Sequence, residues 1–226
     1  MKFEFIWNGK KAEDMGVKVI SLPPLKQSTE RVTEQEVEGR DGSLTELDGY
    51  ETDTKQVEAD YIGTNPRQVS NWLKGSGDVI FGNMDDRYYK ARINNFVPIS
   101  QIIENHLYSF PVAFRCQPFG YLLDGKEEKT ISNGTVLFHD KADYISLPLI
   151  TINGTGACTF TINSRSFNIL EIGGTITIDS DIEEVLNGKG NQMIGKFPYL
   201  DAGENTISWT GTNITSVILK PNWRAL

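Results

Sequence analysis

Two places in the sequence set acidic side chains next to each other, and paired carboxylates can act as acid and base in hydrolysis. They are Asp85-Asp86, followed by Arg87, and Glu183-Glu184. Adjacent side chains in a strand point to opposite faces, so neither pair shares a site by its spacing. A glycosidase needs its two carboxylates at a set separation across a cleft. Turns or solvated faces therefore explain these pairs better than catalysis, and we name no catalytic residue.

Histidine and cysteine are scarce, with two residues of each type. His106 and His139 belong to no metal-binding spacing such as HxxxH, and no CxxC occurs, so we expect no metal ion and no cofactor. A Cys116–His106 dyad would need a coincidence of folding. Cys116 and Cys158 each lie in an apolar, strand-like run. We favour two buried free thiols, with one bridge between them as the alternative.

Aromatic residues in the second half of the chain could contact a sugar. The candidates are Tyr199, Trp209 and Trp223, in a region whose predicted fold often occurs in lectins. Core packing is the favoured explanation, and Trp209 alternates with Ile207 in a way that points it inward.

The charge is concentrated in one segment. The 226-residue chain has a formal net charge of −8. Residues 30 to 60 hold eleven acidic and three basic side chains, which alone give −8. A nucleic-acid-binding surface needs clustered Lys and Arg to neutralise phosphates, so this class of function is disfavoured. The acidic run is either a solvated face or the wall of a passage for another polyanion.

No apolar run approaches the roughly 18 residues that a membrane-spanning helix requires. The first residues, MKFEFIWNGKK, contain no apolar core of a signal peptide. We therefore expect a protein that folds in a cytoplasm and does not insert into a membrane.

The first half predicts strands around one helix. Lys2–Asn8 alternates, with Phe3, Phe5 and Trp7 on one face, and Val17–Leu22 is a second strand. From residue 27 to 61 there are few large apolar side chains, which predicts long strands or a hairpin without a buried face. Such strands need neighbours in the same chain or in other subunits. Their turn is Arg40-Asp41-Gly42.

The predicted helix is Asn65–Lys74. Asn65 is suited to cap it, a proline follows, and Val69, Trp72 and Leu73 form an apolar stripe. Two strands come next, 78–81 and 88–94. We expect Asp85 and Asp86 in the turn between them, because their side chains bond nearby backbone N–H groups. Arg87 would lock that corner to a carboxylate or reach a neighbouring subunit.

From about residue 131 onward the pattern is of strands alone. Turn signals such as Asn153-Gly154 and Ala202-Gly203 separate them. Spacing of roughly 8–12 residues between turns predicts a β-sandwich or jelly roll. The expected strands are 146–152, 158–162, 166–171, 175–179, 204–209 and 214–220.

Several stretches together resemble the distal tail (Dit) protein family of long-tailed siphophages and related prophages. No single stretch is decisive, but their order and spacing run over almost the whole chain. They are Trp7–Gly9, Glu38–Leu44, Leu73–Gly75, Phe81–Ala91, Phe114–Tyr121, Phe197–Ile207 and Pro221–Arg224.

The resemblance implies a mainly β protein of two domains. Residues 1–128 would form a ring-building β-sandwich with one short helix and an extended hairpin. Residues 129–226 would form a galectin-like or jelly-roll β-sandwich. Family members form a ring, typically a hexamer, at the virion tail tip. The ring joins the tail tube protein to the tail-associated tip protein, and DNA passes through it without specific binding.

The resemblance also assigns the acidic segment a place. Intersubunit strand pairing would give the hairpin its neighbours, and six copies would place a charge of about −48 around a pore. The candidate lumen residues are Glu34, Glu36, Glu38, Glu46 and Glu51. The second half has no long insertion of the kind that some relatives use as an arm for receptor-binding proteins, which argues against direct attachment of such proteins. We therefore expect a structural protein and no enzyme, with a carbohydrate-binding module for host-surface recognition as the alternative.

Overall fold

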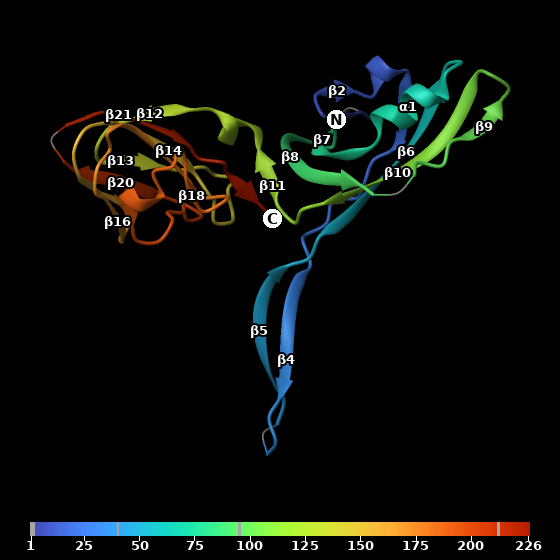
Figure 1. Cartoon of the computed structure of the whole chain (residues 1–226). Coiled ribbons are helices and arrows are strands. Elements are labelled where there is room, and N and C mark those ends of the chain that lie inside the picture. The colour runs from blue at the N-terminus through green and yellow to red at the C-terminus, as the bar shows by residue number, and fades with distance from the viewer. Residues whose placement is uncertain (1–2, 40, 95, 212) are drawn as a thin grey trace. The chain divides into compact units, whose positions relative to one another are not determined.

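The computed structural model describes residues 3–39, 41–94, 96–211 and 213–226. The chain folds into two compact units, residues 1–120 with Leu226, and residues 121–225. The boundary expected from the sequence lies a few residues later, after residue 128. Strands are the main regular element of both units, which confirms the mainly β fold class (Figure 1). Each unit is described by itself below.

The N-terminal unit is organised by one antiparallel sheet with the strand order β2-β1-β7-β8-β10-β6-β3, and β9 pairs with β10. Short turns connect β1 with β2, β7 with β8, and β9 with β10, and a 3-10 turn, Glu13–Met15, precedes β3. The strands are β1 (Phe5–Trp7), β2 (Lys10–Lys11), β3 (Val17–Ser21), β6 (Asp53–Ile62), β7 (Gly75–Phe81), β8 (Met84–Ile93), β9 (Ser100–Ile103) and β10 (Leu107–Cys116).

Aromatic rings form the core of this sheet. Phe5, Trp7 and Phe81 are fully buried, and each has its ring centroid within 5.7 Å of that of Phe114. The period-2 pattern predicted this face for Phe5 and Trp7. It wrongly included Phe3, which lies before β1 and is 67% exposed.

The only α-helix in the described residues is α1 (Pro66–Trp72). Two indole N–H groups fasten it to β1: Trp7 Nε1 donates to the Trp72 carbonyl at 3.1 Å, and Trp72 Nε1 to the Trp7 carbonyl at 3.4 Å. The Trp72 ring also stacks on Phe5. The predicted helix was close, but the Asn65 side chain makes no capping hydrogen bond.

The turn between β7 and β8 lies earlier than predicted. Phe81 pairs with Met84, so Gly82 and Asn83 form the turn. Asp85 and Asp86 therefore lie in strand β8, and the expectation that they make the corner is wrong. Gly82-Asn83 lies between two apolar runs and is itself a two-residue hairpin signal. The prediction took the neighbouring aspartates as the turn instead.

The hairpin of β4 (Glu30–Glu36) and β5 (Ser43–Tyr50) is a separate two-stranded sheet. It extends as an arm from its own unit (Figure 1). The prediction of strands without a buried face holds for this arm. It fails for β6, which belongs to the same acidic segment but lies between β10 and β3 and buries Val57 and Ala59.

The C-terminal unit contains two five-stranded antiparallel sheets that enclose an apolar core, a β-sandwich as predicted. One has the order β12-β21-β14-β17-β18, and the other β13-β20-β15-β16-β19. Strands β15 (Cys158–Ile162) and β21 (Ile214–Lys220) have the predicted bounds. The remaining strands of the two sheets are β12 (Lys129–Ile131), β13 (Thr135–Leu137), β14 (Leu149–Gly154), β16 (Arg165–Ile169), β17 (Gly174–Asp179), β18 (Glu184–Val185), β19 (Met193–Ile194) and β20 (Asn205–Thr210).

Shorter elements complete this unit. Strand β11 (Gly120–Leu122) pairs with β22 (Arg224–Ala225), which brings the two ends of the unit together. Two 3-10 turns are present, Leu123–Lys126 and Gly190–Gln192. The lack of a convincing α-helix pattern in the sequence of this half agrees with these short turns.

Candidate functional site

The arm formed by β4 and β5 is the candidate assembly site. Every residue of β4 is exposed, and so are the first six of β5. Arg31 Nη2 donates to the Asp48 carbonyl at 2.8 Å, and Thr33 Oγ1 donates to the Asp48 carboxylate. Polar contacts across the strands and the backbone ladder therefore hold the arm together, without an apolar core.

The strand register assigns the side chains of the arm to two faces. Val32 pairs with Leu47 and Glu34 with Thr45, so these four share one face. The opposite face carries the intervening pairs, Thr33 with Glu46 and Gln35 with Leu44. Val32 and Leu47 are 43% and 53% exposed, which leaves an apolar pair without cover in the single chain.

The candidate lumen residues are all exposed but are not on one face. Glu34 and Glu36 lie on the Val32 face, and Glu46 lies on the other. Glu38 follows β4, and Glu51 follows β5, where its N–H donates to the Thr29 carbonyl. One face of the arm therefore cannot present all five to a pore, and their assignment to a lumen stays a prediction.

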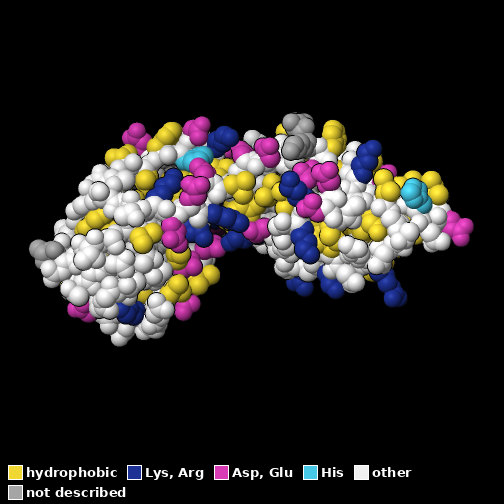
Figure 2. All heavy atoms as spheres, turned by 90° about the horizontal axis from the view of Figure 1, so that it is seen from above, with side chains coloured by type: hydrophobic (Ala, Val, Ile, Leu, Met, Phe, Trp, Pro, Cys, Tyr) yellow, Lys and Arg dark blue, Asp and Glu magenta, His cyan; other side chains and the backbone are white. Residues whose placement is uncertain are grey.

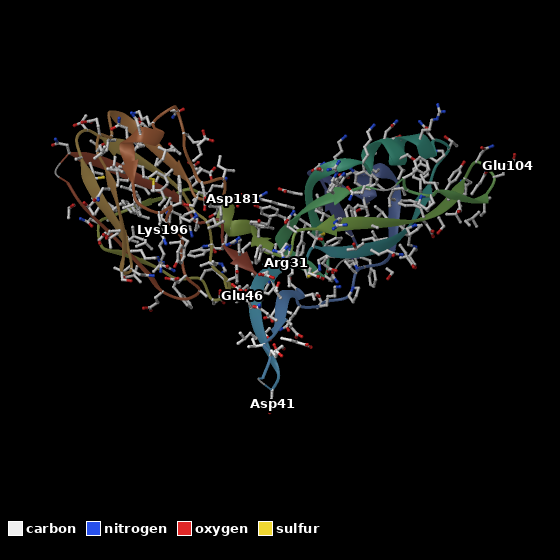
Figure 3. All side chains as sticks on the ribbon, turned by 60° about the horizontal axis from the view of Figure 1, so that its bottom comes forward. Arg31, Asp41, Glu46, Glu104, Asp181 and Lys196 are labelled. Carbon is white, nitrogen blue, oxygen red and sulfur yellow. The ribbon has the colours of Figure 1, made fainter. Side chains whose placement is uncertain are left out.

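The turn at the end of the arm lies between Glu36 and Ser43. Gly39 and Gly42 both have φ of +81°, a left-handed conformation that glycine adopts without steric cost. Asp41 is exposed at the tip (Figure 3). Arg40, a candidate assembly residue, lies outside the described residues.

A partly buried ion group lies where the arm joins its sheet. Asp53 accepts from Lys26 Nζ at 2.7 Å and from Lys55 Nζ at 3.0 Å. Lys55 is only 6% exposed and lies 4.8 Å from the Tyr89 ring centroid. Burial opposes ionisation of Asp53, but the two lysine hydrogen bonds outweigh it and hold the pKa of its carboxyl below the usual range. Sequence reasoning missed this group, because Lys26 and Asp53 are 27 positions apart.

Asp86 and Arg87 form an ion pair rather than a reaction centre. Arg87 Nε donates to Asp86 Oδ1 at 2.9 Å, so the predicted contact of Arg87 with a carboxylate is present, although within a strand. Asp85, the preceding residue of β8, is exposed.

Both cysteines are free and buried, as favoured from the sequence. Burial raises the pKa of the Cys116 thiol to about 12 and raises that of Cys158 as well. A thiol is a poor nucleophile when its thiolate is disfavoured in this way. Within the described ranges, no three or more His, Cys, Asp or Glu side chains gather where they could hold a metal ion.

The three aromatic sugar-contact candidates differ in their surroundings. Trp223 is 2% exposed in the core, so it has no face to offer a ligand. Trp209 is half-buried and stacks on Phe160 with ring centroids 5.6 Å apart. Tyr199 lines a pocket beneath the Arg165 guanidinium. Core packing therefore explains the position of Trp223 and of the buried part of Trp209. Tyr199 is the candidate that could still contact a ligand.

On the face shown in Figure 2, basic and acidic side chains are interspersed, with no continuous basic field. No helix in the described part of the chain has the length and hydrophobicity that crossing a membrane requires.

Comparison with solved structures identifies the fold. Models of known protein families and curated protein sequences give no match. The structure of the phage SPP1 Dit protein, described as a paradigm of the hub adsorption apparatus in phages that infect Gram-positive bacteria, aligns with 96% of both chains. The TM-score is 0.70 and the sequence identity 14%. The chain has the Dit fold.

A second solved structure extends this result. A chain of the phage P2 baseplate aligns with 99% of this chain and 98% of its own, with a TM-score of 0.50 and 10% identity. The Dit fold therefore covers both units of the chain, although few residues are identical. This is the family that the ordered stretches of the sequence resemble.

Proposed function

We propose that this protein is a structural hub of a phage tail and has no catalytic activity. Copies of the chain would form a ring, a hexamer as the family resemblance implies, at the virion tail tip. The ring would join the tail tube protein to the tip protein and leave a channel through which DNA passes. The main support for this proposal is the structural similarity to the SPP1 Dit protein, which spans 96% of each chain.

The arm supplies a physical reason for assembly. A two-stranded hairpin with no apolar face buried is marginal in water. Its outer strand edges carry unpaired backbone N–H and C=O groups, which can pair with a neighbouring chain. A ring of identical head-to-tail contacts would pair every arm and leave no free end. Val32 and Leu47, exposed side by side on one face, would then be covered.

The acidic charge of the arm fits a passage for DNA. A negative wall offers no cations to replace the counterions of the phosphates, so it does not retain the polymer. Glu46 lies on the face opposite Val32 and Leu47, so it is the candidate that the arm could present to the lumen while the face of Val32 and Leu47 contacts a neighbouring subunit. Glu34 and Glu36 share the face of Val32 and would lie at the edge of that contact.

The candidate catalytic groups support a non-enzymatic role because they do not converge. The two thiols are buried in separate units, and their pKa values are raised. Asp86 is occupied by Arg87, and Asp85 precedes it in the same strand.

The test is the mass and shape of the assembled protein. Size-exclusion chromatography with light scattering should give six copies of the 25.3 kDa chain, about 152 kDa. Negative-stain images should show a ring with an open pore. A monomer at high protein concentration that also forms no ring when mixed with the purified tube and tip proteins would overturn the proposal.

A further inference from the structure

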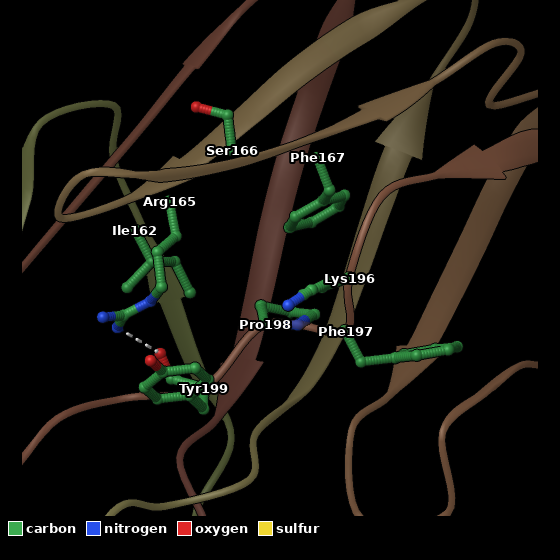
Figure 4. Close-up of a pocket in the computed structure, with 8 residues that line it drawn as sticks. All are labelled: Ile162, Arg165, Ser166, Phe167, Lys196, Phe197, Pro198 and Tyr199. Carbon is green, nitrogen blue, oxygen red and sulfur yellow. Dashed lines mark hydrogen bonds between the residues drawn. The ribbon is translucent and has the colours of Figure 1, made fainter.

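A pocket of about 380 Å³ lies in the C-terminal unit, between β16 and the segment that follows β19 (Figure 4). This volume is within the range of sites that hold small ligands. Sheet residues form one wall, and a non-strand segment forms the other. The lining residues are Ile162, Arg165, Ser166, Phe167, Lys196, Phe197, Pro198 and Tyr199.

Arg165 is held in place before any ligand arrives. Its Nη2 donates to Asp201 Oδ2 at 2.7 Å and to the Tyr199 carbonyl at 3.1 Å. The guanidinium carbon lies 3.8 Å from the Tyr199 ring centroid. Asn163 Nδ2 donates to the same Asp201 oxygen at 2.7 Å, which fixes the carboxylate in turn. Arg165 Nε is buried and has no acceptor among the described residues, whereas the side chain as a whole is 34% exposed, so a ligand would reach the guanidinium away from Nε.

Lys196 places a second cation on the pocket. The preceding residue, Gly195, has φ of +128°, and a Cβ there would lie 3.1 Å from the Phe167 Cβ. Glycine therefore lets the segment run close against Phe167 and carry Lys196 to the opening. The lysine side chain extends toward Pro198 (Figure 4). It is exposed and has no ion-pair partner in the part of the chain that the structure describes.

The charge of the pocket is opposite to that of its unit. Residues 121–225 contain twelve Asp and Glu and eight Lys and Arg, a formal net charge of −4. The pocket lining contains two cations and no acidic residue. Arg165 is already paired with Asp201, so the unpaired charge of the pocket is that of Lys196, and the partly exposed guanidinium lies on the same pocket. An unpaired cation in an acidic unit, beside a second cation, indicates an anionic ligand.

The rest of the wall specifies more than charge. Phe197 and Tyr199 supply aromatic surface beside the two cations, whereas Phe167, which is 2% exposed, closes the wall behind them. Aromatic rings pack against the apolar C–H face of a sugar ring and exclude water from it. An isolated Asp or Glu side chain of a protein partner would satisfy the charges and leave this aromatic surface uncovered.

We propose that this pocket binds one sugar unit that bears a carboxylate or a phosphate. The acidic group contacts Lys196 and the Arg165 guanidinium, and the sugar ring packs on the aromatic wall beside Tyr199. This goes beyond the hub function: it gives the C-terminal unit a binding site for an anionic saccharide. Ring assembly does not depend on it.

The experiment measures sugar binding to the full chain by saturation-transfer difference NMR, which tolerates a large assembly. Glucuronate supplies a carboxylate, glucose 6-phosphate a phosphate, glucose no charge, and inorganic phosphate a charge without a ring. One of the two acidic sugars should bind about tenfold more tightly than glucose, the ratio expected of one charge-assisted hydrogen bond. Whichever of the two acidic sugars binds identifies the acidic group that the site recognises.

Variants assign the binding to the pocket. Lys196→Met removes an exposed ammonium, so the fold should be kept, and affinity for the acidic sugar should fall about tenfold. Lys129→Met is the matched control, because Lys129 is an exposed lysine of β12 in the same unit and does not line the pocket. The affinity of this variant for the acidic sugar should not change. Phe197→Ala should weaken the binding of the acidic sugar but not that of inorganic phosphate.

Any of four results would overturn the proposal. The first is that neither acidic sugar binds at concentrations up to about 10 mM, which detect very weak sites. The second is that glucose binds as tightly as the acidic sugars. The third is that the Lys196→Met variant and the unmodified protein bind the acidic sugar with equal affinity. Inorganic phosphate that binds as tightly as glucose 6-phosphate would also overturn it, because the ring would contribute nothing. The mass of the assembly, measured on the same samples, reports separately on the hub function.

Discussion

The arm and the C-terminal sandwich are both made of antiparallel strands, yet only one of them has an interior. In β15 alternate residues are buried, with Phe160 fully enclosed. In β4 no residue is buried, although Val32 is apolar, and Val37 just after it is exposed as well. Backbone pairing is similar in the two regions, so the difference lies in what covers the side chains.

This difference separates folding from assembly. The sandwich buries its apolar side chains within its own unit and can be stable as a single chain. The arm adds little burial to the single chain and has strand edges and an apolar pair that a neighbour can cover. Mutations should therefore affect the stability of the monomer in the sandwich, and association in the arm.

The largest expected effect on stability is at the sandwich core. Phe160→Ala should lower the free energy of unfolding by about 3–5 kcal/mol, because it removes a fully buried ring and leaves a cavity. Chemical denaturation of the chain under monomeric conditions would measure this. Leu47→Ala in the arm, at a side chain that is 53% exposed, is the matched comparison and should change it by less than about 0.5 kcal/mol. Similar losses at the two positions would contradict the comparison.

A smaller effect is expected at a polar lock of the sandwich. Lys189 Nζ donates to the carbonyls of Ile172, Gly173 and Thr175 at 2.7–3.0 Å. Lys189→Met should cost about 1–3 kcal/mol in the free energy of unfolding, because carbonyls near β17 lose their donor. Lys129→Met, an exposed lysine of the same unit, is the control. An unchanged unfolding midpoint for Lys189→Met would show that water replaces the ammonium without cost.

The arm's junction should respond to acid. Lys26 and Lys55 hold the folded-state pKa of Asp53 below its ordinary value of 3.8, so its ionised form stabilises the folded chain. This contribution is present above pH 3.8 and is lost as the pH falls below it through the folded-state pKa. Unfolding measured between neutral pH and about pH 2 should show Asp53→Asn losing less stability on acidification than the unmodified protein. Parallel pH profiles for the two would contradict the assignment.

The smallest effect on monomer stability should accompany the loss of assembly. Val32→Thr with Leu47→Thr keeps the strand propensity of the arm but removes its exposed apolar pair. The free energy of unfolding should change by less than about 0.5 kcal/mol, because both side chains are exposed. Light scattering should then report a smaller fraction of assembled protein. Thr45→Val, on the same face, is the converse change and should not weaken assembly.

Sequence pattern predicted the local elements well. The alternation of β15 and β21 predicted their bounds. The lack of large apolar residues from 27 to 61 predicted strands without a buried face, which holds for β4 and β5 and fails for β6. These signals are local, because a strand's faces are encoded by every second residue. The corner at Asp85-Asp86 was placed wrongly, because turn-forming residues also occur inside strands and only the pairing of Phe81 with Met84 fixes the turn.

The sequence by itself determined that this protein is mainly β, acidic in one segment, and divided into a strand-and-helix part and an all-strand part. Its ordered stretches also indicated the family whose fold the structure shows. Only the tertiary structure decided which distant residues meet: Arg165 with Asp201, and Lys26 with Asp53. The physical reason is that period-2 burial is written into neighbouring residues, whereas a pocket or an ion group depends on how strands far apart in the chain pair.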